Sequence, residues 1–327
     1  MAMMKYGAAL VGAIRGCMER DTAVNLVAGS IGGPGGASIM QGIVKDFADR
    51  IVDPPISEGA LAGICTGAAM SGLRPILPFG TASFMQRGWD QIIHEAGICH
   101  YMSNGKVRTP VVFHALHGLR GGGAPQHSLS PQAMFWNNPG LEIVMPSTPA
   151  DVSGLFRAAV ESDNPTVFLD HAKLMGTEGE VPDGGPAIPL GVADIKRAGD
   201  DVTIVAISLQ VLRALEAAET LAGEGISAEV VDLRTLVPLD RAAIFASLDK
   251  TGRLVIVDEG PPHCSVAAEI AAIIAEDGFD KLRAPIARVT RLQAPAAASP
   301  TLEDALGPTP ERIADAARGI LEYKPAG

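Results

Sequence analysis

The chain has 327 residues, and its 26 Lys and Arg against 37 Asp and Glu give a formal net charge of −11. Hydrophobic residues make up 47% of the sequence and charged residues 19%, which excludes a disordered chain and allows a large buried core. The acidic balance argues against a nucleic-acid-binding protein, because such proteins normally carry a basic face. No apolar run approaches the roughly 20 residues of a membrane helix, and four scattered cysteines without a CxxC pair indicate reduced thiols. We therefore expect a cytoplasmic globular enzyme or enzyme subunit that has no membrane partner.

Short, nearly continuous apolar runs alternate with Ala-rich stretches of helical periodicity along most of the chain. Such runs are typical of strands covered by helices on both faces. They lie at residues 23–28, 109–115, 141–146, 166–170, 202–207, 228–233 and 253–258. Helices are expected at residues 60–72, 211–223 and 266–276. The alternation predicts an α/β fold with parallel sheets built from βαβ units.

A Gly- and Pro-rich stretch without periodicity, GTEGEVPDGGPAIPLG at residues 176–191, is typical of a linker. It divides the chain into an N-terminal α/β domain, residues 1–185, and a C-terminal domain, residues 186–327. Two domains also suit the length, because a single core usually stops growing at about 250–300 residues.

Two glycine-rich stretches follow expected strands. Residues 29–36 (GSIGGPGG) lack the GxGxxG spacing of a dinucleotide site and predict an irregular loop. Residues 118–123 (GLRGGG) have two interpretations: Arg120 could meet an anion there, or the stretch could form a flexible loop over a cleft. The Walker sequence and the GxSxG motif are both absent from the chain, so the sequence supports neither an NTPase nor a serine nucleophile.

His127 lies in the sequence GGGAPQHSLSP, between a glycine-rich stretch and an expected helix. A histidine near a helix start most often only forms hydrogen bonds, so a structural and a catalytic role both remain open. His114 and His117 flank the end of an expected strand, where open α/β sheets place their ligands. No histidine pair has the spacing of a transition-metal site.

Glu58 follows a Pro-Pro break in PPISEG and precedes the almost wholly apolar helix expected at residues 60–72. A carboxylate at a helix start commonly acts as a cap or as a partner of the helix dipole. Because this one lies at the edge of a buried element, it is also placed to donate or share a proton. From the residues alone, the two roles of Glu58 are equally open.

Four long motifs occur in order along the chain: PPISEGALAGICTGAAMSGLRPI (54–76), PQHSLSPQAMFWNNPGLEIVMPSTPAD (125–151), GISAEVVDLRTLVPLD (225–240) and AAEIAAIIAE (267–276). Together they closely resemble the beta subunit of the thiamine-diphosphate-dependent decarboxylating component of 2-oxo acid dehydrogenase complexes. The pyruvate, branched-chain 2-oxo acid and acetoin enzymes form this group. The resemblance extends from Tyr6 to about Leu321. It implies a thiamine-diphosphate-binding fold, with a pyrimidine-binding domain and a transketolase C-terminal-like domain for subunit packing.

In this family an alpha subunit supplies the diphosphate and magnesium site, and the beta subunit supplies the aminopyrimidine site. The resemblance therefore implies thiamine diphosphate as cofactor, magnesium held mainly by the partner, and a heterotetramer of two alpha and two beta subunits. It assigns to Glu58 the hydrogen bond to the aminopyrimidine ring, and to Phe84 the packing on that ring. It also assigns His127 to the 2-oxo acid and to acyl transfer onto the lipoyl arm of an acyltransferase.

A structural potassium ion is implied as well, held mostly by backbone carbonyls. Its ligands would be Val111, Ala159, Val160, Ser162 and Asn164. Ser162 stands where the family usually has Asp, and it lies in the Asx- and Ser-rich sequence ESDNP, which suits a turn that presents carbonyls.

The chain departs from the family at Ser30, where an acid normally contributes to the acidic surroundings of the cofactor. This departure suggests a divergent member with an unusual acyl substrate, or one outside a standard complex. The leading interpretation is 2-oxo acid decarboxylation followed by acyl transfer to a lipoyl carrier. The alternatives are carboligation, in which the same carbanion attacks an aldehyde, and a non-catalytic scaffold. Retention of Glu58, Phe84 and His127 argues against the scaffold.

Overall fold

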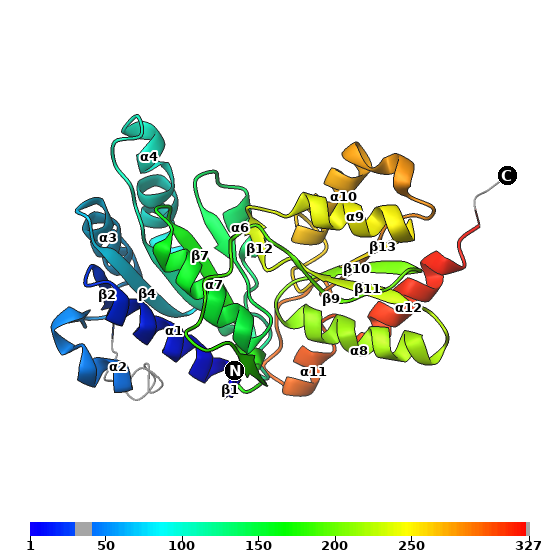
Figure 1. The fold of residues 1–327 in the computed structure, drawn as a ribbon, viewed down its shortest axis with the longest axis horizontal. Helices are drawn as coiled ribbons and strands as arrows, with labels where there is room; N and C mark the ends of the chain where they lie inside the picture. The colour runs from blue at the N-terminus through cyan, green and yellow to red at the C-terminus, as the bar shows by residue number, and fades with distance from the viewer. Residues whose placement is uncertain (30–40, 325–327) are drawn as a thin grey trace.

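The computed structural model describes residues 1–29 and 41–324, which form two lobes side by side (Figure 1). Each lobe is a β-sheet with helices on both of its faces, which confirms the expected α/β fold. The left-hand lobe in Figure 1 holds the N-terminal half of the chain, and the right-hand lobe holds most of the C-terminal half. No helix in the described ranges is both long enough and apolar enough to cross a membrane.

The first sheet has seven strands in the order β12-β6-β7-β5-β4-β2-β3. Its strands are β2 (Val24–Val27), β3 (Ile51–Val52), β4 (Arg74–Thr81), β5 (Val112–His117), β6 (Glu142–Val144), β7 (Thr166–His171) and β12 (Thr235–Val237). Neighbouring strands are parallel except for β12, which is antiparallel to β6.

Helices cover both faces of this sheet. They are α1 (Tyr6–Arg20), α2 (Gln41–Asp46), η2 (Ala48–Arg50), α3 (Glu58–Met70), the 3₁₀ helix η3 (Ala82–Gly88), the π-helix η4 (Gln91–Gly97), α4 (Ile98–Met102), α5 (Ala124–His127), α6 (Gln132–Trp136), α7 (Pro149–Glu161) and η5 (Ala172–Leu174). Successive strand residues point to opposite faces, as the two-residue period of a strand requires. Ile76 and Val112 thus share a cluster with α1 and α7, whereas Leu77 and Phe113 share one with α3 and η4.

The second sheet has five strands in the order β14-β13-β10-β11-β9, and only β9 is antiparallel to its neighbour. Its strands are β9 (Asp194–Arg197), β10 (Val202–Ala206), β11 (Ala228–Asp232), β13 (Leu254–Asp258) and β14 (Ala287–Thr290). Its helices are α8 (Leu209–Gly223), α9 (Arg241–Thr251), α10 (Val266–Asp277), η6 (Phe279–Lys281), α11 (Pro300–Asp304) and α12 (Pro310–Leu321). The helices α8 and α12 pack on one face, and α9 and α10 pack on the other.

The two lobes share one of the three clusters of buried apolar residues. A single cluster contains Leu77 and Phe113 of the first sheet together with Val205 and Val231 of the second. The chain also crosses the seam, which is the boundary between the two lobes. The strand β12 comes from the C-terminal half of the chain and forms the edge of the first sheet beside β6. The division of the chain at residue 185 remains a prediction, and β12 shows that the first sheet needs residues from both sides of it.

The strands and helices predicted from the sequence all exist, with ends displaced by at most three residues. The stretch at 176–191, predicted to be a linker, contains a short strand, because β8 (Glu178–Val181) pairs with β1 (Ala2–Lys5). The sequence also gave no sign of the central strand β4, since Pro75 and Pro78 argue against a strand between two others. The strand accommodates them with a register shift between Pro78 and Thr81.

A close backbone contact fixes the chain before β6. Gly140 has a φ of +94°, and a Cβ atom at this position would lie 1.9 Å from the carbonyl oxygen of Gly97, at the end of η4. Only glycine satisfies both conditions, the left-handed backbone and the missing side chain.

We expect Gly140→Ala to lower the free energy of unfolding by more than about 2 kcal/mol, because it adds backbone strain to a clash with backbone atoms. Gly223→Ala is the matched control. Gly223 ends α8 in an exposed position with open space around its Cβ, so alanine there should raise stability by about 0.4–1 kcal/mol. Urea unfolding of both variants checks this, and equal stabilities would contradict the contact.

Candidate functional site

Three strands end at the same edge of the first sheet and place polar side chains there. β4, β5 and β7 are parallel neighbours, so their carboxyl ends, at Thr81, His117 and His171, lie together. The register of β5 and β7 puts His117 directly opposite His171, and the two rings lie edge to face with centroids 5.0 Å apart. Open α/β sheets bind ligands at this edge.

The predicted residue His127 lies in the loop that follows β5. It ends the short helix α5, and its side chain is exposed. Its ring packs edge to face against the half-buried ring of Phe84 in η3, with centroids 5.4 Å apart and planes at 74°. The Thr81 hydroxyl donates a hydrogen bond to the carbonyl of His127, 3.3 Å away. The structure therefore brings two of the predicted site residues into direct contact.

Glu58, the third predicted residue, is the first residue of α3 and is half-buried. Two glycines let the start of α3 lie directly on the end of η3. A Cβ at Gly88 would lie 3.2 Å from the carbonyl oxygen of Glu58, and a Cβ at Gly59 would lie 3.2 Å from that of Arg87. Glu58 and Phe84 are thus carried by two elements in backbone contact.

The glycine stretch 118–123 does meet an anion, but the anion is a side chain of the protein itself. The carboxylate of Glu303 in α11 accepts hydrogen bonds from the amides of Arg120, Gly121 and Gly122. The guanidinium of Arg120 donates hydrogen bonds to the Thr81 hydroxyl and to the Leu116 carbonyl. The interpretation of the stretch as a flexible loop therefore gives way to a loop held by hydrogen bonds.

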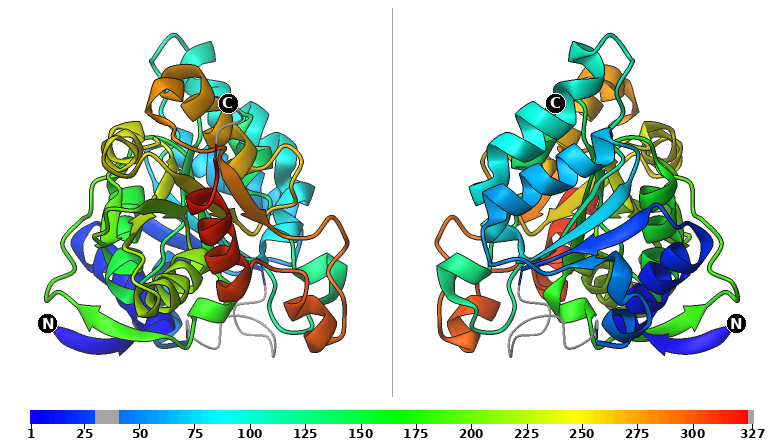
Figure 2. Two further views of the ribbon diagram at one scale, coloured as in Figure 1. Left: turned by 90° about the vertical axis from the view of Figure 1, so that its right-hand side faces the viewer. Right: turned by 90° about the vertical axis from the view of Figure 1, so that its left-hand side faces the viewer.

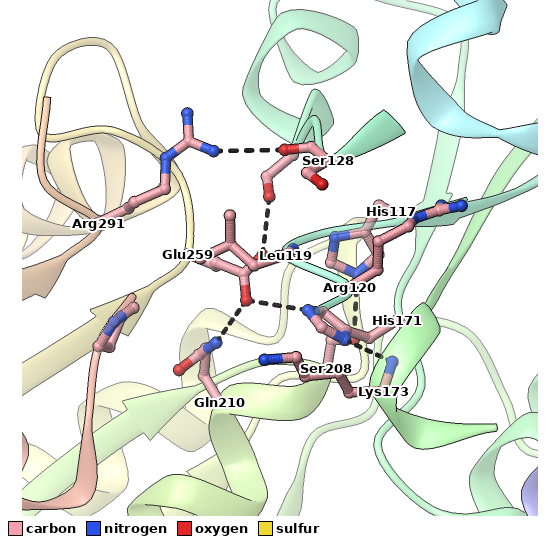
Figure 3. Close-up of polar contacts among 12 residues, drawn as sticks. His117, Leu119, Arg120, Ser128, His171, Lys173, Ser208, Gln210, Glu259 and Arg291 are labelled. Carbon is pink, nitrogen blue, oxygen red and sulfur yellow. Dashed lines mark hydrogen bonds and ion pairs between the residues drawn. The ribbon is translucent and has the colours of Figure 1, made fainter. Parts of the chain in front are cut away.

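A second carboxylate of the C-terminal half, Glu259, is buried beside the same loop (Figure 3). It accepts hydrogen bonds from the backbone amide of Leu119 at 2.7 Å, the Ser130 hydroxyl at 3.2 Å and the side-chain amide of Gln210 at 3.0 Å. It also pairs with the ring of His171 at 2.9 Å. Burial alone raises the pKa of Glu259, but His171, through its charge and its hydrogen bond, and the other donors lower this pKa to about 2. Glu259 is therefore ionised at neutral pH, and it joins the two lobes through hydrogen bonds.

Sequence reasoning missed Glu259 and Glu303 as site residues. Glu303 lies in an ordinary-looking sequence, TLEDA, that gives no sign of burial. Glu259 follows directly on a buried strand, and this position at a carboxyl end was the one signal that could have indicated it.

The residues predicted to bind potassium lie at the opposite edge of the sheet, near the amino ends of β4, β5 and β7. Arg74 donates hydrogen bonds to the carbonyls of Val160 (3.0 Å) and Ser162 (2.8 Å) and pairs with Asp163. The carbonyl of Val111 accepts from the Thr166 amide. Two of the five predicted ligands, the carbonyls of Val160 and Ser162, thus converge on one cationic group. This group is the guanidinium of Arg74.

Two further expectations concern metals and the cofactor surroundings. Across residues 1–29 and 41–324, no three His, Cys, Asp or Glu side chains are grouped as metal ligands. Ser30, and with it most of the loop predicted at 29–36, lies outside the described residues.

Comparisons with known proteins agree in the two halves of the chain. A model of the transketolase pyrimidine binding domain matches residues 2–177, and one of the transketolase C-terminal domain matches residues 191–313. The chain is also similar to a solved split gene transketolase, described as an inactive beta4 tetramer. The TM-score is 0.84 at 22% identity, with 98% of this chain and 100% of that chain covered, which shows a common fold.

Curated relatives are similar over nearly their full length. The beta subunit of acetoin:2,6-dichlorophenolindophenol oxidoreductase from Cupriavidus necator is 44% identical over 93% of this chain and 94% of its own. The 2-oxoisovalerate dehydrogenase subunit beta of Bacillus subtilis is 41% identical over 99% and 100%. The pyruvate dehydrogenase E1 component subunit beta of Rickettsia felis is 40% identical over 88% and 89%.

Acid should destabilise the folded chain through His117. Burial, and then the neighbouring His171, lower the pKa of His117 to about 3, against 6.5 for a free histidine. Between these values the unfolded chain binds a proton that the folded chain does not, so stability falls as the pH drops through this window. Asp232 acts in the opposite direction, because burial and the nearby Asp151 raise its pKa to about 6.

Comparison with His117→Asn isolates the histidine, because asparagine does not titrate and leaves Asp232 in place. From pH 7 to pH 5, we expect the wild-type free energy of unfolding to fall by about 2 kcal/mol more than that of the variant. Urea unfolding at both pH values measures the difference. Parallel pH dependences would show that His117 is not held neutral.

Proposed function

We infer the activity of this chain from its family: it belongs to the beta subunits of the thiamine-diphosphate-dependent 2-oxo acid dehydrogenases. We propose that it forms the aminopyrimidine half of a shared active site. The complete enzyme would decarboxylate a 2-oxo acid and pass the acyl group to a lipoyl carrier. The partner would be an alpha subunit in a two-alpha, two-beta heterotetramer, and a lipoyl-bearing acyltransferase would receive the acyl group.

One observation carries this proposal: Glu58, Phe84 and His127 lie on three segments that contact one another at the carboxyl edge of the first sheet. Phe84 contacts the ring of His127, and η3 contacts the first turn of α3, which Glu58 opens. None of the three side chains is fully buried, so all can reach a ligand. A carboxyl group and an aromatic ring carried by contacting segments suit a planar heterocycle with ring nitrogens.

The residues present therefore fit the aminopyrimidine of thiamine diphosphate. When bound, the cofactor supplies a nucleophilic carbon that cleaves a 2-oxo acid between its carbonyl and carboxylate groups. Glu58 would hold a proton against a pyrimidine ring nitrogen, and Phe84 would pack on the ring. His127 would hydrogen-bond the carbonyl oxygen of the acyl group during its transfer. Magnesium and the diphosphate are assigned to the alpha subunit, following the division of roles in the family.

Coexpression with an alpha-type partner tests the proposal, followed by an assay of a panel of 2-oxo acids and of acetoin with an artificial electron acceptor. Glu58→Gln should reduce turnover by about 10²–10⁴-fold, because the amide keeps the volume but cannot share the proton. Glu216→Gln, an exposed position on α8, is the control and should match the wild type. If Glu58→Gln keeps more than roughly a tenth of the turnover, a loss of only about 1.4 kcal/mol, Glu58 is not the activating acid. An aldehyde adduct as the main product would indicate carboligation instead.

We also propose a weak potassium site at Val111, Ala159, Val160, Ser162 and Asn164. The carbonyls of Val111, Val160 and Ser162 each have a second lone pair beyond the bond that they already accept, while the charge of Arg74 opposes a second cation. Potassium should therefore raise the melting temperature slightly more than sodium at equal ionic strength, because it binds only the folded state. Arg74→Met should enlarge this difference, since it removes the competing charge. Equal melting temperatures in both salts, in both proteins, would exclude the site.

A further inference from the structure

We propose that Glu303 is a positioning residue that holds the loop of His127 in its working conformation from the C-terminal lobe. The inference rests on the proposed function, because it concerns the role of His127 in acyl transfer. Both views in Figure 2 place α11, which carries Glu303, beside the short helix α5.

The carboxylate of Glu303 fills a cradle of backbone amides. It accepts hydrogen bonds from Arg120 N (3.3 Å), Gly121 N and Gly122 N (2.8 Å), and the Ser128 hydroxyl donates a fourth at 2.9 Å. The side chain is fully buried, with 0% exposed. Successive amides that point at one centre form an anion-binding nest, and here the anion is built into the chain.

The backbone of the glycine stretch explains why the cradle forms. Gly121 and Gly122 have φ values of +86° and +102°, and residues with side chains rarely adopt such angles. A Cβ at Gly122 would lie 3.1 Å from the carbonyl of Ala298, just before α11. A Cβ at Gly123 would lie 2.5 Å from the Ser128 hydroxyl. The glycines therefore let the loop close on itself and on the segment that carries Glu303.

The cradle is directly linked to His127. Ser128, the fourth donor to Glu303, is the next residue in the chain, and its carbonyl accepts a hydrogen bond from Arg291 at 3.4 Å (Figure 3). On the other side, Thr81 donates to the carbonyl of His127. Glu259 holds the two ends of the loop through Leu119 and Ser130. The backbone of His127 is thus fixed from both sides, and Glu303 is the contact at the centre of the loop.

The charge of Glu303 suits this role. Burial alone raises the pKa of its carboxyl group, but the amides of Gly122, Gly121 and Arg120 and the Ser128 hydroxyl hold it below the usual range. The group is therefore ionised at neutral pH. In this form it can accept the hydrogen bonds that the several N–H donors of the loop require. Without it, three backbone amides and the buried Ser128 hydroxyl would lose their shared partner, and the loop would no longer have one preferred conformation.

The test uses the coexpressed alpha–beta complex with two acceptors, free lipoamide and an artificial electron acceptor. Glu303→Ala should lower kcat for acyl transfer to lipoamide by at least about tenfold, because small displacements of a reacting group cost about that much or more. Turnover with the artificial acceptor should change by less than about twofold, because Glu58 and Phe84 lie outside the loop. Acetate should restore part of the lost transfer by occupying the vacated cradle, an effect that a general loss of stability would not produce.

Three further variants make the outcome decisive. Asp304→Asn is the matched control, since Asp304 is the neighbour of Glu303 and its side chain forms an exposed ion pair with Lys173; it should behave as the wild type. His127→Ala sets the expected maximum loss of transfer. Glu303→Gln, which keeps the volume, replaces the alanine variant if that one fails to assemble, and it should speed hydrogen exchange at residues 120–122.

The outcomes separate the two levels of inference. If His127→Ala leaves acyl transfer unchanged, the proposed function of His127 fails. If His127→Ala impairs transfer while Glu303→Ala and Glu303→Gln both match the wild type in transfer, the role of Glu303 is overturned. Loss of activity with both acceptors and no rescue by acetate would also overturn it, in favour of a purely structural role.

Discussion

A carboxylate buried between two sheets is stable only if its hydrogen-bonding capacity is used, because the desolvation of a charge costs more than most single contacts return. Glu259 meets this condition with partners from both lobes, His171 and Leu119 on one side and Gln210 on the other. Each partner must lie at a fixed distance from one small group. The orientation of the two lobes and the path of the loop after β5 both depend on this requirement.

A second network of charged side chains joins the two lobes across the seam, at positions distant in the chain from Glu259. Asp151 at the start of α7 is fully buried and pairs with Lys196 (2.7 Å) and Arg234 (2.7 Å), which come from the other half. Burial opposes its ionisation, but the two cations lower the pKa of Asp151. Burial, and then the neighbouring Asp151, raise the pKa of Asp232. Such pairs add little net stability. They do penalise any arrangement of the lobes that separates them, which makes the seam specific as well as apolar.

The sequence predicted those parts of the molecule that depend on local pattern. Continuous apolar runs indicated the buried strands, and the motif around Glu58 indicated a helix that begins there, because both follow from residues close together in the chain. β4 was missed because Pro75 and Pro78 contradict the usual composition of a central strand. Glu303 and Glu259 were missed for another reason: their partners lie 182 and 140 residues away, at Gly121 and Leu119. Only the packed fold shows that an ordinary acidic residue is an internal ligand. Cytoplasmic localisation stays a prediction.

The strand exchange at the seam has a consequence for synthesis on the ribosome. β6 ends at Val144, but its neighbour β12 begins only at Thr235. At about 5–20 residues per second, the nascent chain needs on the order of ten seconds to deliver that partner. During this interval the N-terminal sheet has an open edge whose backbone groups can pair with another strand. A nascent chain that stalls between these two points would therefore have a folded sheet whose edge at β6 is unpaired. Nascent chains on neighbouring ribosomes of the same messenger RNA would have the same unpaired edge.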